Sequence, residues 1–425
     1  MDVTVKKTEN LKGAVSAPPS KGYTHRMLIA ASLSDGDSKI FNPLVSNDTL
    51  VTLEAVKAIG AEVELYETCW NIRGHGTIKV PIHPINCGES GSTLRFMIPV
   101  LALAPGPSKF LFSASLKRRP VAPLLKSLKE LGAESIIQSD GFSVMVQGGG
   151  IRGGKASIRG DVSSQFISGL LFACPKAEKD TEISITTELE SRSYVEMTLE
   201  VIVEHGLQGA VNADLSRLWI PSNQSYRPCD QTVPGDFSSA AFLLAAAAVT
   251  SSKVTVKNIS CQTCQGDRVI LEILQEMGAF VTVRNDSVQL ECDKLFGVDI
   301  SAQDIPDLVP ICAVLGCYAE GVSEIHNAQR LRYKESDRLD SISRELNKMG
   351  AEIIVNEDGL TINGGRPLHG AIVDPHNDHR IAMACAVAAL GAERETKIRD
   401  VECINKSYPQ FFRDLCVLGA NVDGV

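Results

Sequence analysis

A repeat of about 70 residues is the feature that most restricts how this chain of 425 residues can fold. In each copy, a helix-like segment ends in glycine, usually followed by alanine, and a short strand-like segment comes next. Glycine in this position is typical of the residue that ends an α-helix with a positive φ angle. The glycines are Gly60, Gly132, Gly206 (in a degenerate copy), Gly278, Gly350 and Gly419. The sequence therefore predicts six copies of one structural repeat.

Each copy has a pattern typical of helix, strand, helix, strand, strand. The first copy contains predicted helices at 23–34 and 47–59 and predicted strands at 38–44, 61–67 and 69–74. The fourth contains predicted helices at 236–249 and 266–277 and predicted strands at 253–259, 279–285 and 287–292. Residues 238–249 are apolar on nearly every face, so we expect that helix to be buried on all sides. This favours compact domains with internal helices over an open solenoid.

We predict two domains of three repeats each, because a chain of this length exceeds one ordinary domain. The last repeat runs to the C-terminus, whereas a predicted strand at 2–7 precedes the first helix. One domain is therefore expected to combine residues 1–20 with 234–425, and the other to span 21–233, with a hinge where the chain crosses twice. The predicted fold class is α/β (α+β), a two-domain inside-out α/β barrel built from six repeated β/α units.

The formal net charge of −9 argues against a general binder of nucleic acid or of membrane surfaces, since both attract an excess of Lys and Arg. The N-terminus has no apolar core of signal-peptide length, and no apolar run approaches the roughly 18 residues of a membrane span. These observations predict a soluble, cytoplasmic protein. The cysteines occur singly in apolar runs, as expected for reduced thiols. Cys261 and Cys264 form one CxxC pair without a second, which disfavours a zinc site.

Basic residues recur where the predicted helices begin, a position at which the helix dipole disfavours cations. These residues are Lys21, Arg26, Arg95, Arg119, Lys334, Arg338, Arg380 and Lys406. Ordinary helix capping accounts for Asp236, Ser238 and Asp378, but it does not account for the cations. Helix starts also favour anions, because their backbone N–H groups lack partners within the helix. The pattern predicts that the cations face a shared anionic ligand.

Two carboxylates lie among these cations in the sequence. Glu335 belongs to the segment Lys-Glu-Ser-Asp-Arg (334–338), in which a carboxylate and a lysine are suitable partners for proton transfer. The alternative is a solvated helix face with ion pairs between residues three apart. Asp307 follows Ile-Pro and precedes an apolar run, so it is either a helix cap or a base placed over a substrate hydroxyl.

Nine sequence motifs, in their order along the chain, resemble those of the EPSP synthases, a family of enolpyruvate transferases. They are PSKGYTHR, CGESGSTLR, RRPVAPLL, SSQF, GDFSSAAFLLAAAA, IPD, LRYKESDRL, NDHRIAMA and CINKSYP, and they extend over nearly the whole chain. The resemblance implies two domains with the active site in the cleft between them. It also implies transfer of the carboxyvinyl group of phosphoenolpyruvate to the 5-hydroxyl of shikimate 3-phosphate, on the route to chorismate. A monomer without metal or other cofactor is implied as well, since protein cations neutralise the phosphates.

The same resemblance, carried over residue by residue, implies a set of binding residues. Those for shikimate 3-phosphate are Lys21, Gly22, Arg26, Ser163, Ser164, Gln165, Ser191, Asp307 and Lys334. Those for phosphoenolpyruvate are Lys21, Gly91, Arg119, Gln165, Arg338, Arg380 and Lys406. Asp307 is the candidate to receive the hydroxyl proton, while Glu335 and Lys21 are candidates for proton transfer at C3 and at the leaving phosphate. Arg95 is expected to support the site without touching the substrates.

Gly22 departs from the family pattern, in which a serine directly follows the first lysine. The backbone N–H group remains at this position, but the hydroxyl group is missing. The departure therefore predicts weaker binding of shikimate 3-phosphate.

Two alternative functions stay open at this point. Carboxyvinyltransferases that act on UDP-N-acetylglucosamine share the fold and the donor, but they carry a mechanistic cysteine at the position that corresponds to Ala114. The KESDR and SSQ motifs also favour shikimate 3-phosphate as the acceptor. A non-catalytic repeat protein that binds anions would explain the repeat, but it would not explain why Asp307 and Glu335 lie among cations.

Overall fold

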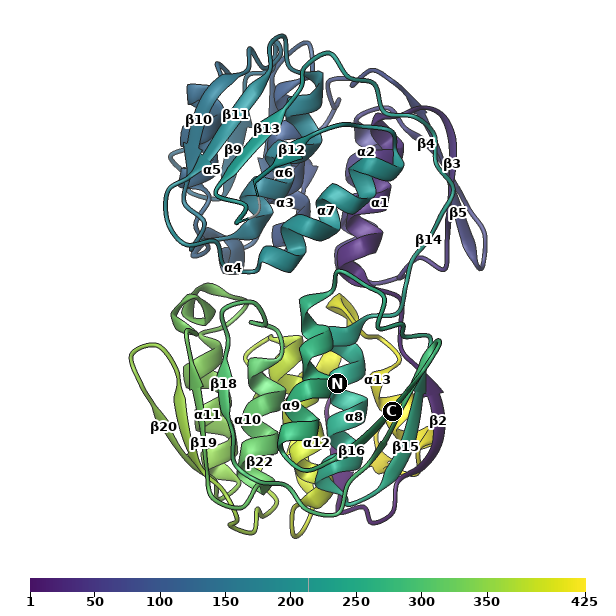
Figure 1. Cartoon of the computed structure of the whole chain (residues 1–425), viewed down its shortest axis with the longest axis vertical. Helices are drawn as coiled ribbons and strands as arrows, with labels where there is room; N and C mark the ends of the chain where they lie inside the picture. The colour runs from purple at the N-terminus through teal and green to yellow at the C-terminus, as the bar shows by residue number, and fades with distance from the viewer. Residues whose placement is uncertain (213) are drawn as a thin grey trace. The chain divides into compact units, whose positions relative to one another are not determined.

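The computed structural model describes residues 1–212 and 214–425, which form two compact units. The terminal unit consists of Met1–Pro18 and Pro234–Val425, and the inserted unit consists of Pro19–Val233 (Figure 1). The chain thus leaves the terminal unit after its first two strands and returns to it for the second half of the sequence.

Within the described residues, the strands form six four-stranded sheets with one shared topology. In each sheet, one edge strand runs parallel to its neighbour, and the other neighbouring pairs are antiparallel. The sheets of the inserted unit are β14 (Gln231–Thr232)–β3 (Asp35–Phe41)–β5 (Cys69–His75)–β4 (Glu62–Leu65), β6 (Ile85–Asn86)–β7 (Ser108–Leu111)–β9 (Ser143–Val146)–β8 (Ser135–Ile137), and β10 (Gly154–Ile158)–β11 (Thr181–Ile185)–β13 (Arg217–Ile220)–β12 (Ala210–Val211). Those of the terminal unit are β2 (Lys12–Ser16)–β15 (Lys253–Lys257)–β17 (Ser287–Glu291)–β16 (Phe280–Arg284), β18 (Asp299–Ser301)–β19 (Val322–His326)–β21 (Leu360–Asn363)–β20 (Glu352–Val355), and β22 (Ile372–Val373)–β23 (Thr396–Ile398)–β1 (Val3–Lys6)–β24 (Asn421–Asp423). The sixfold α/β repeat predicted from the sequence is confirmed.

The N-terminal strands explain why residues far apart in sequence share the terminal unit. Strand β1 lies between β23 and β24 and pairs with both in antiparallel fashion, while β2 pairs in parallel with β15. The first 18 residues therefore complete two sheets whose other strands come from the second half of the chain.

Each repeat contributes two helices. The first helices are α1 (Lys21–Leu33), α3 (Gly91–Ala102), α6 (Ser164–Ala173), α8 (Phe237–Val249), α10 (Val309–Tyr318) and α12 (His379–Gly391). The second helices are α2 (Asn47–Ala58), α5 (Ala122–Glu130), α7 (Arg192–Glu204), α9 (Ile270–Glu276), α11 (Arg338–Lys348) and α13 (Phe411–Val417). Shorter segments are α4 (Ala114–Lys117) and the 3₁₀ helices η1 (Cys174–Lys176), η2 (Gly266–Val269), η3 (Gln329–Tyr333) and η4 (Val401–Lys406). The six glycines of the repeat each lie just beyond a second helix with φ angles between 80° and 108°, as predicted.

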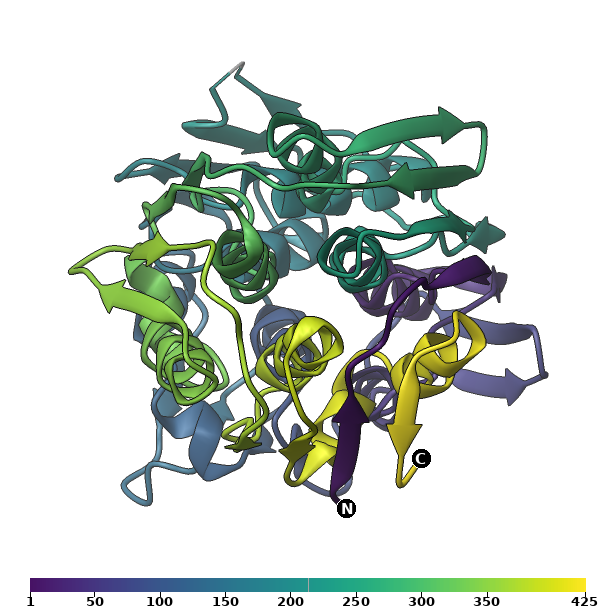
Figure 2. The same cartoon turned by 90° about the horizontal axis from the view of Figure 1, so that it is seen from below.

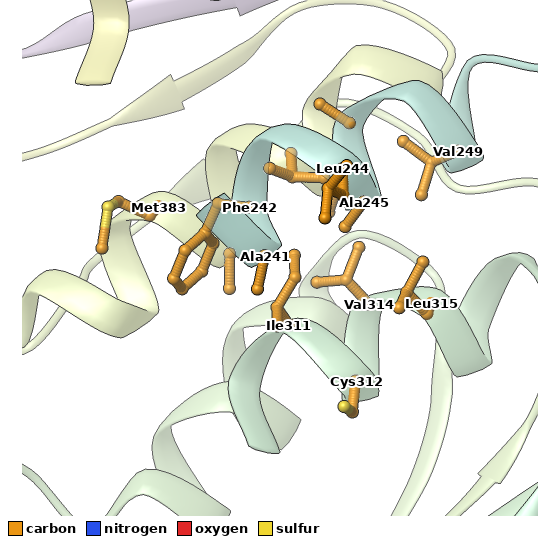
Figure 3. Packing of buried hydrophobic residues seen from close by; sticks show 14 of the residues in the cluster. Ala241, Phe242, Leu244, Ala245, Val249, Ile311, Cys312, Val314, Leu315 and Met383 are labelled. Carbon is orange, nitrogen blue, oxygen red and sulfur yellow. The ribbon is translucent and has the colours of Figure 1, made fainter. Parts of the chain in front are cut away.

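The first helices form the interior of each unit. In the terminal unit, α8, α10 and α12 contact one another, and every residue of α8 is buried, as its apolar sequence predicts. Figure 2 looks along these helices and shows strands of the unit around their outside. In Figure 3, Phe242 and Ala245 of α8 face Ile311 and Val314 of α10. The helix starts that carry the candidate site residues are thus held by a tightly packed core.

Some predicted boundaries are wrong by a few residues. The strand expected at 38–44 is β3, which begins at Asp35 and ends at Phe41, because Asn42 has a φ of 53° and Pro43 has no N–H group to donate. Arg119 was expected at the start of a helix, but it lies between α4 and α5. Lys334 and Glu335 likewise precede α11, whose N-cap is Asp337.

Candidate active site

The first turn of α1 presents Lys21 and Gly22. Ser20 caps this helix, since its hydroxyl accepts a hydrogen bond from the Tyr23 N–H group. Lys21 Nζ lies 3.0 Å from Oδ2 of Asp48 on α2, an ion pair that the sequence analysis did not predict. Asp48 therefore holds Lys21 at the helix start. A bound anion must share the lysine with Asp48 or displace Asp48 from it.

Arg26 uses most of its guanidinium within the inserted unit. It donates to Thr198 Oγ1 (2.8 Å), to the Gly22 carbonyl (2.9 Å) and to the Tyr194 carbonyl (2.8 Å). Burial lowers the pKa of Arg26 to about 10. The side chain ties the start of α1 to α7, so its predicted contact with shikimate 3-phosphate stays a prediction.

Arg119 and Gly91 lie against each other. Arg119 follows α4, and its guanidinium covers the first residue of α3 so closely that a β-carbon at Gly91 would lie 3.1 Å from three of its atoms. Ser90 caps α3 by accepting from the Thr93 N–H group (3.3 Å). The bare backbone at Gly91 thus allows a cation to sit beside a helix N-terminus, an arrangement suited to an anion.

Gln165 is held in one orientation by two neighbours. Arg95 Nη1 donates to Gln165 Oε1 (2.8 Å), and Gln165 Nε2 donates to Ser92 Oγ (2.8 Å). Arg95 also lies within 3.4 Å of Ser163 Oγ, which caps α6, and donates to the Pro120 carbonyl (3.0 Å). Arg95 therefore supports Gln165 and Ser163, and the expectation that it does not touch the substrates stays a prediction. Ser164, the first residue of α6, is buried next to them.

Ser191 stands at the start of α7 in an unusual conformation. Its φ and ψ are 55° and 45°, in the left-handed region, and its side chain makes no capping hydrogen bond. Two residues later, the buried hydroxyl of Ser193 has no hydrogen-bond partner. Strained backbone of this kind at a non-glycine residue is common at functional sites.

In the terminal unit, Arg338 joins three carboxylates. Its Nε lies 2.8 Å from Asp378 Oδ2, its Nη1 lies 2.6 Å from Asp307 Oδ1, and its Nη2 lies 2.8 Å from Glu335 Oε2. Asp378 also caps α12 through the Arg380 N–H group (2.9 Å). The sequence predicted cations that face a ligand, and it did not predict that Arg338 would be surrounded by carboxylates.

Asp307 is paired at both of its oxygens. Oδ1 accepts from Arg338, and Oδ2 lies 3.2 Å from Arg380 Nη2. Burial alone would raise the pKa of Asp307, but Arg380, Arg338 and Lys334 outweigh it and hold the pKa well below its usual range. The carboxylate is therefore ionised at neutral pH.

Two nitrogens of the Arg380 guanidinium group have no hydrogen-bond partner. Its side chain is 2% exposed, yet Nε and Nη1 make no hydrogen bond, and the guanidinium carbon lies 5.8 Å from the centre of the Phe242 ring. Buried donors without partners are costly unless something else accepts from them. Of the predicted phosphoenolpyruvate residues in this unit, Arg380 is best prepared for an anion.

Two lysines lie beside this network. Burial lowers the pKa of Lys334 to about 7, although Asp307 opposes the shift. Lys406, at the end of η4, donates to the Asn377 carbonyl (2.5 Å), two residues before α12. Lys334 is therefore close to its titration point at neutral pH, and Lys406 is directed toward the start of the helix that carries Arg380.

Asp267 is a buried carboxylate to which the sequence analysis gave no role. Ser238 Oγ donates to its Oδ2, while its Oδ1 has no hydrogen-bond partner. Burial, reinforced by the charge of Asp307, raises the pKa of Asp267 to about 7. The signal in the sequence was its place in Gly-Asp-Arg (266–268), where the structure has the 3₁₀ helix η2.

Within the described residues, no group of three or more His, Cys, Asp or Glu side chains is arranged to hold a metal ion. None of the helices in ranges 1–212 and 214–425 is both long and apolar enough to cross a membrane.

Comparison with known proteins identifies the family. Residues 5–415 match the model of the family EPSP synthase (3-phosphoshikimate 1-carboxyvinyltransferase). The chain belongs to the EPSP synthase family. It is 46% identical over 415 residues to the 3-phosphoshikimate 1-carboxyvinyltransferase of Methanocella arvoryzae, with 97% of each chain covered. The enzyme of that name from Methanocaldococcus jannaschii is 42% identical over 425 residues, covering 99% of this chain and 98% of its own.

Solved structures agree with the family. An EPSP synthase from Acinetobacter baumannii superposes with a TM-score of 0.85 at 25% identity and covers 99% of both chains. The enolpyruvyl transferase NikO from Streptomyces tendae has a TM-score of 0.82 at 19% identity over 99% of this chain and 98% of its own, which shows the shared fold alone. The resemblance inferred from the nine motifs is confirmed, and the alternative of a UDP-N-acetylglucosamine enzyme is not favoured.

Proposed function

We propose that this member of the EPSP synthase family transfers the carboxyvinyl group of phosphoenolpyruvate to the 5-hydroxyl of shikimate 3-phosphate and releases phosphate. The observation that carries the proposal is the identity of 42% and 46%, along nearly the full chain, to proteins that bear the name of this activity. The residues described above support it, because both substrates carry a phosphate and a carboxylate that guanidinium groups bind well.

Phosphoenolpyruvate would bind by replacing carboxylates of the protein. Arg380 has two buried nitrogens without partners, whereas every nitrogen of the Arg338 guanidinium is already paired with Asp307, Glu335 or Asp378. An incoming anion therefore competes with Asp307 for the two arginines. Arg119 beside Gly91, Gln165, Lys21 and Lys406 complete the proposed donor-binding set.

The same exchange of partners would prepare Asp307 for chemistry. A carboxylate paired with two guanidinium groups is a weak base, so phosphoenolpyruvate makes Asp307 more basic when it draws the arginines away. Asp307 then accepts the proton of the 5-hydroxyl group while the hydroxyl oxygen attacks C2 of phosphoenolpyruvate. C3 gains a proton in this step, which gives a tetrahedral intermediate at C2.

The second half of the reaction reverses the proton transfer at C3. One proton leaves C3, the C2–C3 double bond forms again, and the C2–O bond to phosphate breaks. Glu335 is the proposed proton carrier at C3, and Lys21 assists the leaving phosphate. Arginine and lysine side chains directed at the developing charge stabilise both transition states.

We propose that shikimate 3-phosphate is bound by the residues that the family resemblance implies. The proposed set is Lys21, Gly22, Arg26, Ser163, Ser164, Gln165, Ser191, Asp307 and Lys334. Hydroxyl groups at the starts of α6 and α7 suit a phosphate, because the backbone N–H groups of a helix start are further hydrogen-bond donors beside the hydroxyl groups.

The deciding experiment measures phosphate release from phosphoenolpyruvate with either shikimate 3-phosphate or UDP-N-acetylglucosamine as acceptor. We expect release only with shikimate 3-phosphate. Turnover with the nucleotide sugar alone would show that the proposed acceptor is wrong, and no turnover with either would favour an anion-binding scaffold. The proposal also includes a cytoplasmic monomer, and light scattering of the purified protein tests the monomeric state.

A further inference from the structure

The loop before α12 contains two strained residues in succession. His376 and Asn377 have φ angles of 53° and 57°, in the left-handed region that residues other than glycine seldom adopt. Such conformations persist only where the surroundings hold them in place. The loop, residues 374–378, therefore requires an anchor.

Glu345 of α11 is that anchor. Its side chain is fully buried, and its Oε2 accepts from the backbone N–H group of Asp374 (2.9 Å). Its Oε1 lies 3.0 Å from Nε2 of His376, so one carboxylate holds the loop at two points. Lys348, one turn further along α11, donates to both oxygens and supplies a positive charge (2.9 and 2.7 Å).

The anchored loop makes hydrogen bonds with all three cationic residues that we propose for phosphoenolpyruvate in the terminal unit. Lys406 Nζ donates to the Asn377 carbonyl (2.5 Å). Asp378 ends the loop, pairs with Arg338 Nε (2.8 Å) and accepts from the backbone N–H group of Arg380 (2.9 Å). A change in the course of this loop would move the partners of the Lys406 and Arg338 side chains together with the N-cap of α12, the helix that carries Arg380.

We propose that Glu345 is a positioning residue for phosphoenolpyruvate: through Asp374 and His376 it fixes the loop that aligns Lys406, Arg338 and Arg380. The inference rests on the proposed function, because it assumes that these cations bind the donor. Glu345 itself is buried behind the loop and does not touch the substrates. Loss of the anchor therefore acts on donor binding and leaves shikimate 3-phosphate binding largely intact, since most of the residues proposed for that substrate lie in the inserted unit.

His376→Ala tests the anchor without placing a new group in the core. It removes the contact with Glu345 Oε1 and leaves the Asp374 contact in place. We expect KM for phosphoenolpyruvate to rise about tenfold, as for a lost hydrogen bond to a charged group, while KM for shikimate 3-phosphate changes less than twofold. His376→Gln should restore most of the parent KM, because its amide can donate from nearly the same position as Nε2.

Glu345→Ala provides the second variant. It removes both loop contacts, with Asp374 and with His376, so KM for phosphoenolpyruvate should rise at least as much as in His376→Ala. Glu291→Gln removes an ion pair with Lys253 on another sheet of the terminal unit and should leave both KM values unchanged. Melting temperatures show whether each variant is folded.

The outcomes separate the two proposals. If the parent protein shows no turnover of phosphoenolpyruvate with shikimate 3-phosphate, the proposed function is wrong. If the parent is active but folded His376→Ala keeps its KM for phosphoenolpyruvate, the positioning role is wrong. Equal increases in both KM values, or no rescue by His376→Gln, would also overturn the inference, since they indicate a general loss of structure.

Discussion

The guanidinium group of Arg119 packs against Gly91 at the start of α3, where a β-carbon would lie 3.1 Å from its nearest atoms. Gly91→Ala should therefore push the guanidinium aside by a few tenths of an ångström or more. We expect KM for phosphoenolpyruvate to rise several-fold, because the guanidinium group is displaced from its position beside the N-terminus of α3. Stability should not fall, since alanine is a better helix former than glycine.

Steady-state phosphate release and thermal unfolding measure the two effects separately. Gly209→Ala is a matched control, because its β-carbon would meet only the Trp219 carbonyl oxygen, at an ordinary distance of 3.6 Å. An unchanged KM for phosphoenolpyruvate in Gly91→Ala would show that Arg119 does not bind the donor from this position.

Glu335→Gln should separate binding from proton transfer. The amide oxygen of glutamine can still accept from Arg338 Nη2, as Glu335 Oε2 does at 2.8 Å, so the local network keeps its shape. The amide cannot carry the proton, and kcat should fall at least tenfold, roughly, with little change in either KM. The control is Glu320→Gln, which removes only an exposed ion pair with Lys294. A kcat within about threefold of the parent would exclude Glu335 from proton transfer.

The lowered pKa of Lys334 predicts that binding of the acceptor depends on pH. Burial lowers its pKa to about 7, so the side chain is charged below this pH and loses its charge as the pH rises. If Lys334 binds the anionic acceptor, kcat/KM for shikimate 3-phosphate should fall above about pH 7. In the bound complex the anion favours the charged form, so the corresponding fall in kcat should lie at higher pH.

Lys334→Arg tests this assignment, because a guanidinium stays charged throughout the accessible range. The alkaline fall in kcat/KM should disappear or move up by more than one pH unit, roughly, whereas Lys253→Arg, at an exposed ion pair with Glu291, should leave the profile unchanged. A profile that is the same in Lys334→Arg and the parent would assign the titration to another group, with Asp267 as the first candidate, because burial raises its pKa to about 7.

Local signals in the sequence were sufficient for the repeat. The glycine after each second helix requires only a positive φ angle, and the apolar residues of α8 require only burial, so neither depends on distant parts of the chain. Strand ends were less predictable, since β3 ends at Phe41 because Asn42 adopts a φ of 53°, and nothing in the local sequence requires that conformation.

Pairing between distant segments was not visible in the sequence. The three carboxylates of Arg338 come from positions 307, 335 and 378, and only Glu335 is a close neighbour in the chain. The prediction that the cations gather around an anion was therefore incomplete, because it overlooked protein carboxylates that occupy the same positions. Asp48 beside Lys21 and the buried Asp267 were missed for the same reason.

Gly22 is the position where the chain departs from its family, and the structure has room for the missing side chain. Gly22 is the second residue of α1, and its φ lies outside the left-handed region. A β-carbon would lie 3.1 Å from Met197 Cε, 3.5 Å from Arg26 Nη1 and 3.7 Å from Ser20 Oγ. The only tight contact is the tip of a flexible methionine, which can move by a few tenths of an ångström.

Gly22→Ser should therefore add a hydroxyl beside Lys21 at little structural cost. A hydrogen bond to a charged group contributes about 1.5–3 kcal/mol, so KM for shikimate 3-phosphate should fall by about tenfold or more. KM for phosphoenolpyruvate and kcat should change little, because the hydroxyl contacts a part of the acceptor remote from C2. Gly22→Ala brings the same contact with Met197 without the hydroxyl, so it should not lower KM. If the serine and alanine variants have equal KM values for shikimate 3-phosphate, the hydroxyl makes no contact with the substrate, and Arg26 Nη1 becomes its expected partner.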